Sequence, residues 1–250
     1  MIASVSLLLV SIVAGTVLLW LFSKVSNQRA IRATKKRLQA RLLEMRLYGD
    51  DPKVVVRAQR ALLGENLRYF ALMLRPAMFA MLPMATLLVL MEGFYGQRPI
   101  APGEQSIVTV QLASLSSDSA APEIQTPDGI VVETPPVRDL ADNQVSWRIR
   151  SDDSASGEIR VRVGKSEAGK RVVTGEGFHY LVSRRGSSAF EWLLHPGEGL
   201  LPNSNIKWIE VAYPPAEISY FGWKTHWLVW FLIFSMVAAF LMKSRFHVTV

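Results

Sequence analysis

The sequence contains no cysteine, which excludes disulfide bonds, cysteine-ligated zinc and catalysis by a thiol. Histidine is also scarce, and the four residues are scattered without metal-ligand spacing: His179, His195, His226 and His247. No glycine-rich phosphate loop follows a predicted strand and opens a helix. We therefore expect a protein that is not an enzyme and that uses no metal, no cofactor and no small-molecule substrate.

Acidic residues are rare in one region of the chain. Between Lys24 and Arg75 there are 13 Lys and Arg residues against 4 Asp and Glu residues. Between Glu92 and Lys224 the balance reverses, with 13 basic residues against 17 acidic ones. A pI near 9.8 favours either a nucleic acid or an anionic membrane face as partner. Because the basic residues flank apolar runs, we expect a lipid bilayer and no specific nucleic acid.

Charged residues are almost missing from three apolar stretches, Met1–Phe22, Ala71–Phe94 and Trp223–Met242. Each is about long enough to cross a hydrocarbon core that is roughly 30 Å thick. The first stretch lacks the basic residues that precede the apolar part of a signal peptide, so we expect it to be a retained anchor. Pro76 and Pro83 predict kinks in the second stretch.

The positive-inside rule predicts the orientation of these spans. The basic segment after the first span is expected in the cytoplasm, and the net-acidic segment after the second span is expected outside. The chain would then be a multi-pass protein of a prokaryotic cytoplasmic (inner) membrane, with its N-terminus outside and its C-terminus inside. The predicted parts are a first transmembrane helix (1–23), a cytoplasmic helical hairpin (24–70), a second transmembrane helix (71–95), an extracytoplasmic β-sandwich (96–221), a third transmembrane helix (222–243) and a cytoplasmic tail (244–250).

The basic segment has the pattern of two helices folded into an antiparallel coiled coil. Its turn is predicted at Gly49, Asp50, Asp51 and Pro52, because glycine ends helices, aspartate caps them and proline suits a first helical position. Apolar residues recur at helical spacing in both arms, at Ile31, Leu38, Leu42 and Met45 in the first and at Val55, Ala58, Leu62 and Tyr69 in the second.

Basic side chains cover the opposite faces of this hairpin: Arg29, Arg32, Lys36, Arg37, Arg41, Arg57 and Arg60, with Arg68 nearby. One interpretation is a solvated surface that also serves as a topology signal. The other is a contact surface for anionic lipid headgroups, for ribosomal RNA or for an acidic partner.

Between Gly103 and Ile218 the apolar pattern changes to a period of two, which is typical of strands. We predict strands at Ser106–Leu112, Gly129–Glu133, Gln144–Arg150, Glu158–Val163, Arg171–Thr174, Phe178–Val182 and Ile206–Tyr213. About seven short strands in a segment of this length predict a small β-sandwich of the Ig-like type. The predicted fold class is therefore a membrane protein of the α+β type.

Small and hydroxyl residues lie within the apolar stretches: Ser4, Ser11, Gly15, Thr16, Thr86 and Ser235. Such residues line ordinary contacts between transmembrane helices. They could instead line a weakly polar groove that receives a polar segment in transit. Arg75 could snorkel to the cytoplasmic interface or attract an acidic substrate tail into that groove.

Three segments resemble the YidC/Oxa-type membrane protein insertases, and in particular their short archaeal and endoplasmic-reticulum relatives. Leu47–Lys53 is similar to the hairpin turn of the bacterial members, Leu67–Pro76 looks like the start of their second core span, and Trp227–Ser235 followed by Lys243 resembles their last span. The resemblance covers Met1–Phe94 and Trp223–Val250 but not the external domain. Many members carry a cation in the first core span, and Met1–Phe22 has none.

The resemblance implies an insertase-like chaperone that assists insertion or folding of membrane proteins. Its hairpin would meet nascent membrane proteins or the ribosome, its three spans would form the groove, and its external domain would bind the substrate or a partner subunit. The alternative is a non-catalytic scaffolding subunit of a larger cell-envelope complex, which would dock partners through the external domain and the hairpin.

Overall fold

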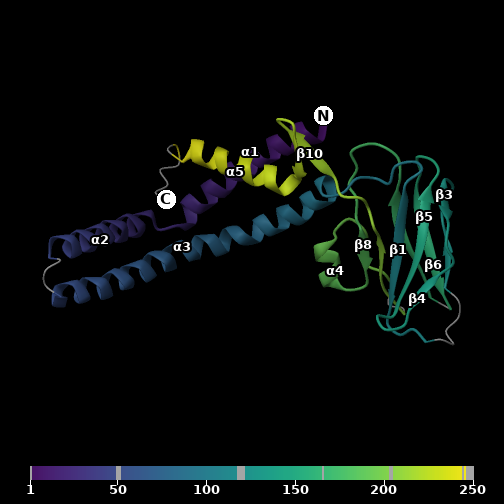
Figure 1. The fold of residues 1–250 in the computed structure, drawn as a ribbon, viewed down its shortest axis with the longest axis horizontal. Coiled ribbons are helices and arrows are strands. Elements are labelled where there is room, and N and C mark those ends of the chain that lie inside the picture. The colour runs from purple at the N-terminus through teal and green to yellow at the C-terminus, as the bar shows by residue number, and fades with distance from the viewer. Residues whose placement is uncertain are drawn as a thin grey trace. The chain divides into compact units, whose positions relative to one another are not determined.

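The computed structural model describes residues 2–48, 52–116, 122–164, 166–202, 205–243 and 245. The protein is of the α+β type, with antiparallel sheets and long apolar helices (Figure 1). It divides into two compact units. The helical unit comprises Val5–Leu87 and Leu228–Val250, and the sheet unit comprises Met1–Ser4 and Leu88–Trp227.

The helical unit is built from α1 (Ile2–Val25), α2 (Gln28–Leu47), most of α3 (Pro52–Tyr95) and α5 (Trp227–Met242). Asn27 caps α2, since its side chain accepts a 3.0 Å hydrogen bond from the backbone amide of Ala30. Among the residues that the structure describes, two stretches are long and apolar enough to cross a membrane, namely α1 and Val55–Tyr95 of α3.

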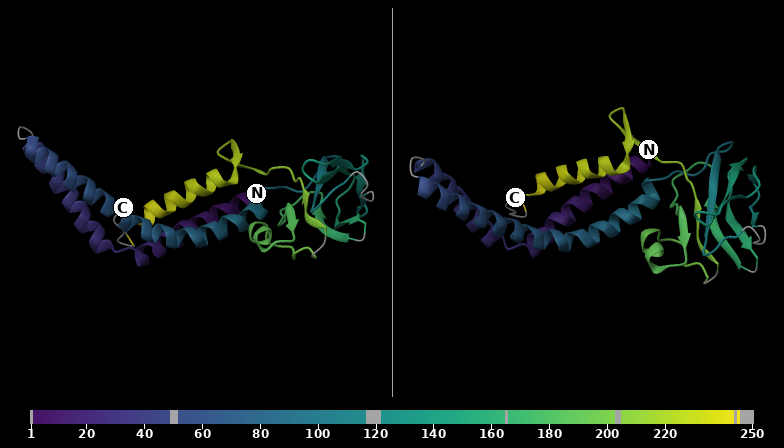
Figure 2. Two further views of the ribbon diagram at one scale, coloured as in Figure 1. Left: turned by 90° about the horizontal axis from the view of Figure 1, so that it is seen from below. Right: turned by 60° about the horizontal axis from the view of Figure 1, so that its bottom comes forward.

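Helices α2 and α3 lie side by side and run in opposite directions (Figures 1 and 2). Ile31 and Ala58 are buried, and Arg37 forms a 3.5 Å ion pair with Glu65 that joins the two helices. Leu42 departs from the predicted buried stripe because its side chain is exposed. Of the predicted turn, Gly49, Asp50 and Asp51 lie outside the described residues, and Pro52 is the first residue of α3.

The second hairpin arm and the predicted second span form a single helix, α3, of 44 residues. Pro76 and Pro83 lie inside it. Each proline lacks the amide that would bond the carbonyl four residues earlier, so the helix is weakened at these points. Figure 2 shows that α3 bends along its length, as helices do at proline.

The third apolar helix is shorter than the sequence predicts. Trp223–His226 is not helical but forms strand β11, which pairs with β10 (Glu217–Tyr220) in a separate hairpin. Helix α5 therefore begins at Trp227 and contains 16 residues. The first four residues of the predicted span include the polar side chains of Lys224, Thr225 and His226, and they pair with β10 instead of continuing the helix.

The sheet unit contains two antiparallel sheets that share one hydrophobic core. The larger sheet has the order β3-β5-β1-β9-β8, with β4 paired to β5, and the smaller sheet has the order β2-β6-β7. The strands are β1 (Gln105–Leu112), β2 (Glu123–Gln125), β3 (Ile130–Val132), β4 (Val137–Asp139), β5 (Gln144–Ser151), β6 (Ser156–Val163), β7 (Ser166–Val173), β8 (Arg184–Gly186) and β9 (Ile206–Val211).

Alternating residues of these strands fill the core. Trp147 on β5 and Val110 on β1 from the larger sheet share it with Val161 on β6 from the smaller one. The register between neighbouring strands is well specified when one face is buried, because a slip by one residue would expose every buried side chain of that strand. The short helix α4 (Ala189–Leu194) follows β8, and Ser188 caps it by accepting from the amide of Glu191.

The alternation predicts most of the longer strands. β1, β5, β6 and β9 lie where the sequence places them, within one or two residues at each end. The predicted strand Phe178–Val182 is wrong, because this segment is not a strand in the structure. Its aromatic side chains pack instead against the end of α3: the ring of Tyr180 lies 4.8 Å from that of Phe94.

Candidate functional site

Helices α1, α3 and α5 of the helical unit enclose a groove of about 700 Å³. Its walls are apolar except for one hydroxyl, that of Ser235. The lining residues are Gly15, Leu18, Leu19 and Phe22 of α1, Ala77, Ala80, Met81 and Met84 of α3, and Leu232, Ile233, Ser235, Met236 and Ala239 of α5. A concave, almost wholly apolar surface of this size suits an apolar ligand or side chains from an apolar helix.

One glycine sets how closely two walls of the groove approach. A Cβ added to Gly15 would lie 2.3 Å from the backbone carbonyl oxygen of Ser235, so only glycine fits here. Ala14 on α1 and Ala238 on α5 are also buried. Small residues of this kind allow helices to pack backbone to backbone, and in a membrane this close packing contributes much of the attraction between helices.

The hydroxyl groups of the apolar helices are engaged within their own helices. Ser11 donates to the carbonyl of Leu7 at 2.7 Å, and Thr16 donates to that of Ile12 at 2.8 Å. Thr86 and Ser235 donate in the same way, at 3.1 Å each, to residues on the preceding turn. Because these donors are already satisfied, the groove offers a polar segment little beyond the acceptor capacity of one serine.

The structure brings two of the seven predicted groove residues together, Gly15 and Ser235. The remaining five are not among the lining residues: Ser4, Ser11, Thr16, Arg75 and Thr86. Ser11 is fully buried, and Arg75 lies exposed on α3. Ser4 belongs to the sheet unit, where its carbonyl accepts a hydrogen bond from the hydroxyl of Tyr220.

Methionine is a feature of the groove that none of the predicted site residues includes. Met81 and Met84 line the wall formed by α3, and Met236 lines the wall formed by α5. The unbranched, polarizable side chain of methionine adapts to differently shaped apolar partners and is common on surfaces that bind many of them. A repeat on α3, rather than a search for hydroxyl groups, is the signal that would have found Met81 and Met84.

That repeat is an apolar heptad pattern with alternating spacings of four and three. It comprises Leu63, Leu67, Phe70, Leu74, Ala77, Met81 and Met84, and we call it the α3 seam. Its last three residues line the groove, whereas Leu63, Leu67, Phe70 and Leu74 are exposed on the part of α3 that precedes the groove. A 4-3 repeat is the pattern by which one helix packs along another, so this face suits a helix beside α3 that also enters the groove.

The predicted basic surface of the hairpin is present on α2 and the first half of α3. All seven of its residues are exposed: Arg29, Arg32, Lys36, Arg37, Arg41, Arg57 and Arg60. Arg41 forms a 2.6 Å ion pair with Glu44 on its own helix, in addition to the Arg37–Glu65 pair between helices. Exposed pairs contribute little stability, so these side chains can exchange partners easily.

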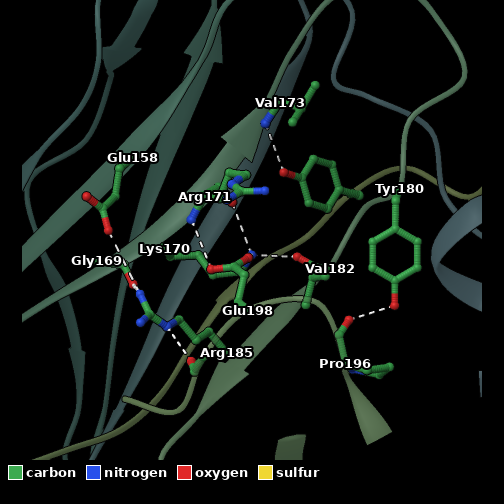
Figure 3. A network of polar contacts seen from close by, with 12 residues as sticks. Glu158, Gly169, Lys170, Arg171, Val173, Tyr180, Val182, Arg185, Pro196 and Glu198 are labelled. Carbon is green, nitrogen blue, oxygen red and sulfur yellow. Dashed lines mark hydrogen bonds and ion pairs between the residues drawn. The ribbon is translucent and has the colours of Figure 1, made fainter. Parts of the chain in front are cut away.

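The sheet unit contains a second candidate site, a network of charged side chains and hydrogen bonds (Figure 3). Lys170 on β7 is fully buried and donates to a carboxylate oxygen of Glu198 and to the carbonyls of Val182, at 2.6 Å, and Arg171, at 3.0 Å. The backbone amide of Arg171 donates to the other oxygen of Glu198 at 3.2 Å.

Neighbouring groups extend this network. Arg185 donates to the carbonyls of Gly169 at 2.7 Å and Gly199 at 2.8 Å, and a polar hollow of about 490 Å³ lies beside it. Burial lowers the pKa of Lys170, an effect that the carboxylate of Glu198 opposes. Since the charged groups are paired with each other or with backbone, the network ties β7 to the loop carrying Glu198 and has the character of a structural link.

Tyr213 closes the same region. Its hydroxyl accepts a 3.1 Å hydrogen bond from the amide of Val173 at the end of β7. Burial raises the pKa of Tyr213 to about 12, and the nearby carboxylate of Glu198 adds to the rise. The phenol is therefore held neutral as part of the core.

Within the described residues, no group of three or more His, Asp or Glu side chains is placed to hold a metal ion. Comparison with known proteins found no match to any protein-family model, curated protein or solved structure.

Proposed function

We propose that this protein is an insertase-like membrane chaperone that holds a transmembrane helix of a client protein in the groove between α1, α3 and α5. The observation that carries the proposal is the groove itself, which is apolar and rich in methionine. A client helix in the groove would replace contacts with lipid by contacts with protein, and its apolar surface would stay in an apolar environment. Its binding would therefore depend on packing and would remain reversible.

The α3 seam supports the same function. A client helix longer than the bilayer would lie along Ala77, Met81 and Met84 inside the groove and continue along Leu67 and Phe70 outside it. The heptad spacing is continuous, so one client helix could pack against the seam both inside the groove and outside it. The resemblance of three segments to the YidC/Oxa-type insertases adds independent support from the sequence.

The proposal includes a multi-pass arrangement in a prokaryotic cytoplasmic membrane, with the hairpin inside and the sheet unit outside. The basic hairpin and the net-acidic sheet unit support this orientation. Helix α5 would be the third span. Its 16 residues extend about 24 Å, which is less than a hydrocarbon core of roughly 30 Å, so the bilayer beside it would have to thin.

Adjacent photo-crosslinkers on α5 provide the test. Met236 lines the groove and is 55% exposed, whereas Val237 is 47% exposed and is not a lining residue. A crosslinker at position 236 should capture newly made membrane proteins in translating cells, and one at position 237 should capture much less. Equal capture at both positions would contradict a groove-based function. Capture of one stable, stoichiometric partner at position 236 would favour the scaffolding alternative.

The basic hairpin is proposed to recruit the ribosome or nascent chain. Reversal of charge at Arg29, Arg32, Lys36 and Arg37 should reduce co-sedimentation with ribosomes, because contacts with phosphates depend on the number of basic side chains. Reversal of four exposed basic residues of the sheet unit, Arg148, Arg160, Arg162 and Arg171, provides the matched control. An unchanged ribosome fraction in the hairpin variant would remove the ribosome from the proposal while leaving the groove intact.

A further inference from the structure

Two apolar projections extend from the sheet unit into solvent. One is the tip of the β10–β11 hairpin, where Phe221 is 89% exposed and Trp223 is 77% exposed. The other is α4, on which Phe190, Trp192 and Leu193 are exposed. Groups of large apolar side chains that are exposed to this extent often mark surfaces that bind a partner or a membrane.

The hairpin tip carries an additional cost. Tyr220 pairs with Trp223, so the turn consists of Phe221 and Gly222, which have φ values of +54° and +84°. A two-residue turn with positive φ at both positions favours asparagine and glycine, and a bulky aromatic residue rarely adopts this conformation. Phe221 therefore has a strained backbone conformation and a side chain that is almost fully exposed. Both features are unfavourable in water.

Both projections are held at the ends of apolar helices, inside the sheet unit. The hydroxyl of Tyr220 donates to the carbonyl of Ser4 near the start of α1. The indole nitrogen of Trp227, one residue after β11, donates a 3.0 Å hydrogen bond to Oε2 of Glu92 near the end of α3. The hairpin is thus attached to two helix ends at once.

Helix α4 is attached to the same end of α3. The amide of Leu181 donates to the carbonyl of Gly93 at 2.8 Å, and the hydroxyl of Tyr180 donates to the carbonyl of Pro196, just after α4, at 2.6 Å. Gly93 permits this contact, because a Cβ at this position would lie 2.4 Å from the ring of Tyr180.

We propose that the hairpin tip and α4 insert into the headgroup region of the outer leaflet and anchor the sheet unit to the bilayer surface. This inference rests on the proposed membrane placement of α1 and α3, whose ends would then mark the water–lipid boundary. Tryptophan and phenylalanine are the side chains that suit this boundary. Lys224 follows Trp223 and is exposed, so its ammonium group is available to lipid phosphates.

The absence of cysteine makes a direct depth measurement possible in the full chain. Single cysteines placed at Phe221, Leu193 and Val137 would carry an environment-sensitive fluorophore, in vesicles whose lipids bear a spin-label quencher near the headgroup. Val137, on β4, is also exposed and belongs to neither projection. We expect blue-shifted emission and at least twofold quenching at positions 221 and 193, and neither effect at position 137.

A fourth label at Val13 of α1, together with deep quenchers, separates this inference from the proposed membrane placement. Quenching at position 13 without quenching at 221 and 193 would overturn the anchor and leave the placement standing. An absence of quenching at all four positions would remove the placement and the anchor together. A blue shift at 221 that depends on protein concentration and not on the quencher would assign the tip to a protein partner or a second copy, and would also overturn the proposal.

Discussion

The α carbon of Gly15 on α1 faces the backbone carbonyl of Ser235 on α5, with no room between them for a Cβ atom. This contact determines the distance between two walls of the groove. Gly15→Ala should therefore separate the helices or strain them, at a cost of about 1–3 kcal/mol. Gly64→Ala is the matched control, because nothing lies within 4 Å of its added Cβ and alanine favours a helix by about 1 kcal/mol.

Thermal unfolding of the two variants in one detergent would measure this difference. The melting temperature should fall for Gly15→Ala and stay equal or rise for Gly64→Ala. A Gly15→Ala protein as stable as the unmodified chain would show that α1 and α5 do not approach as closely as described.

The buried pair Lys170–Glu198 should be far more important for stability than any surface pair. Glu198→Ala leaves the fully buried ammonium of Lys170 without its carboxylate, which costs about 3–5 kcal/mol. Glu167→Ala breaks the 3.1 Å ion pair between Glu167 and Arg162, two side chains that are both about half exposed. It should lower the free energy of unfolding by no more than about 1 kcal/mol. Chemical denaturation followed by tryptophan fluorescence would compare the two. Equal losses would contradict the burial of Lys170.

Tyr213 should make stability fall at alkaline pH. Its pKa is raised to about 12 in the folded state, against about 10 in an unfolded chain. The contribution of the neutral Tyr213 to the free energy of unfolding is therefore complete below pH 10 and is lost as the pH rises towards 12. The total loss over this interval is about 3 kcal/mol. Unfolding free energy measured from about pH 9 to 11 should fall more steeply for the unmodified chain than for Tyr213→Phe. Parallel curves would show that Tyr213 does not titrate across folding.

The elements with strong periodicity were predictable because one physical pattern dominates each of them. Val145, Trp147 and Ile149 alternate with polar residues, and the structure places them on one face of β5 in the core. In the same way, Ile31 and Ala58 lie where the helical stripes of the hairpin place them.

The remaining elements depend on distant contacts that leave no local pattern. The first half of β7 is polar in sequence, yet it pairs along its full length with β6, and its Lys170 is buried only because Glu198 reaches it from a loop. Tyr180 looks like part of a strand, and it instead contacts Phe94 and the carbonyl of Pro196. The groove was predicted at hydroxyl residues, but these bond to their own helices, and its α3 wall instead follows the apolar repeat that includes Ala77, Met81 and Met84.

The α3 seam gives a test of how a client is held. Leu67 is 71% exposed on the seam, and Leu67→Glu would place a charge where a client helix should pack. We expect crosslinking from position 236 to fall several-fold, because an unpaired carboxylate in an apolar contact costs free energy. Leu43→Glu on α2 is the control, since Leu43 is 65% exposed and lies outside the seam. A similar loss in both variants would point to general damage to the hairpin and against docking along the seam.

The strained turn at Phe221 separates stability from membrane attachment. Phe221→Asn should relieve the turn, because asparagine tolerates positive φ far better than phenylalanine, and the sheet unit should gain about 1 kcal/mol in detergent. The same change removes the most exposed aromatic ring from the tip, so a fluorophore at Leu193 or Trp223 should lie less deeply in lipid. A variant that is more stable in detergent and less quenched in vesicles is the outcome expected if Phe221 anchors the protein to the membrane. A loss of stability would instead mean that the ring of Phe221 packs within the protein, and the hairpin tip would then have no role in attachment.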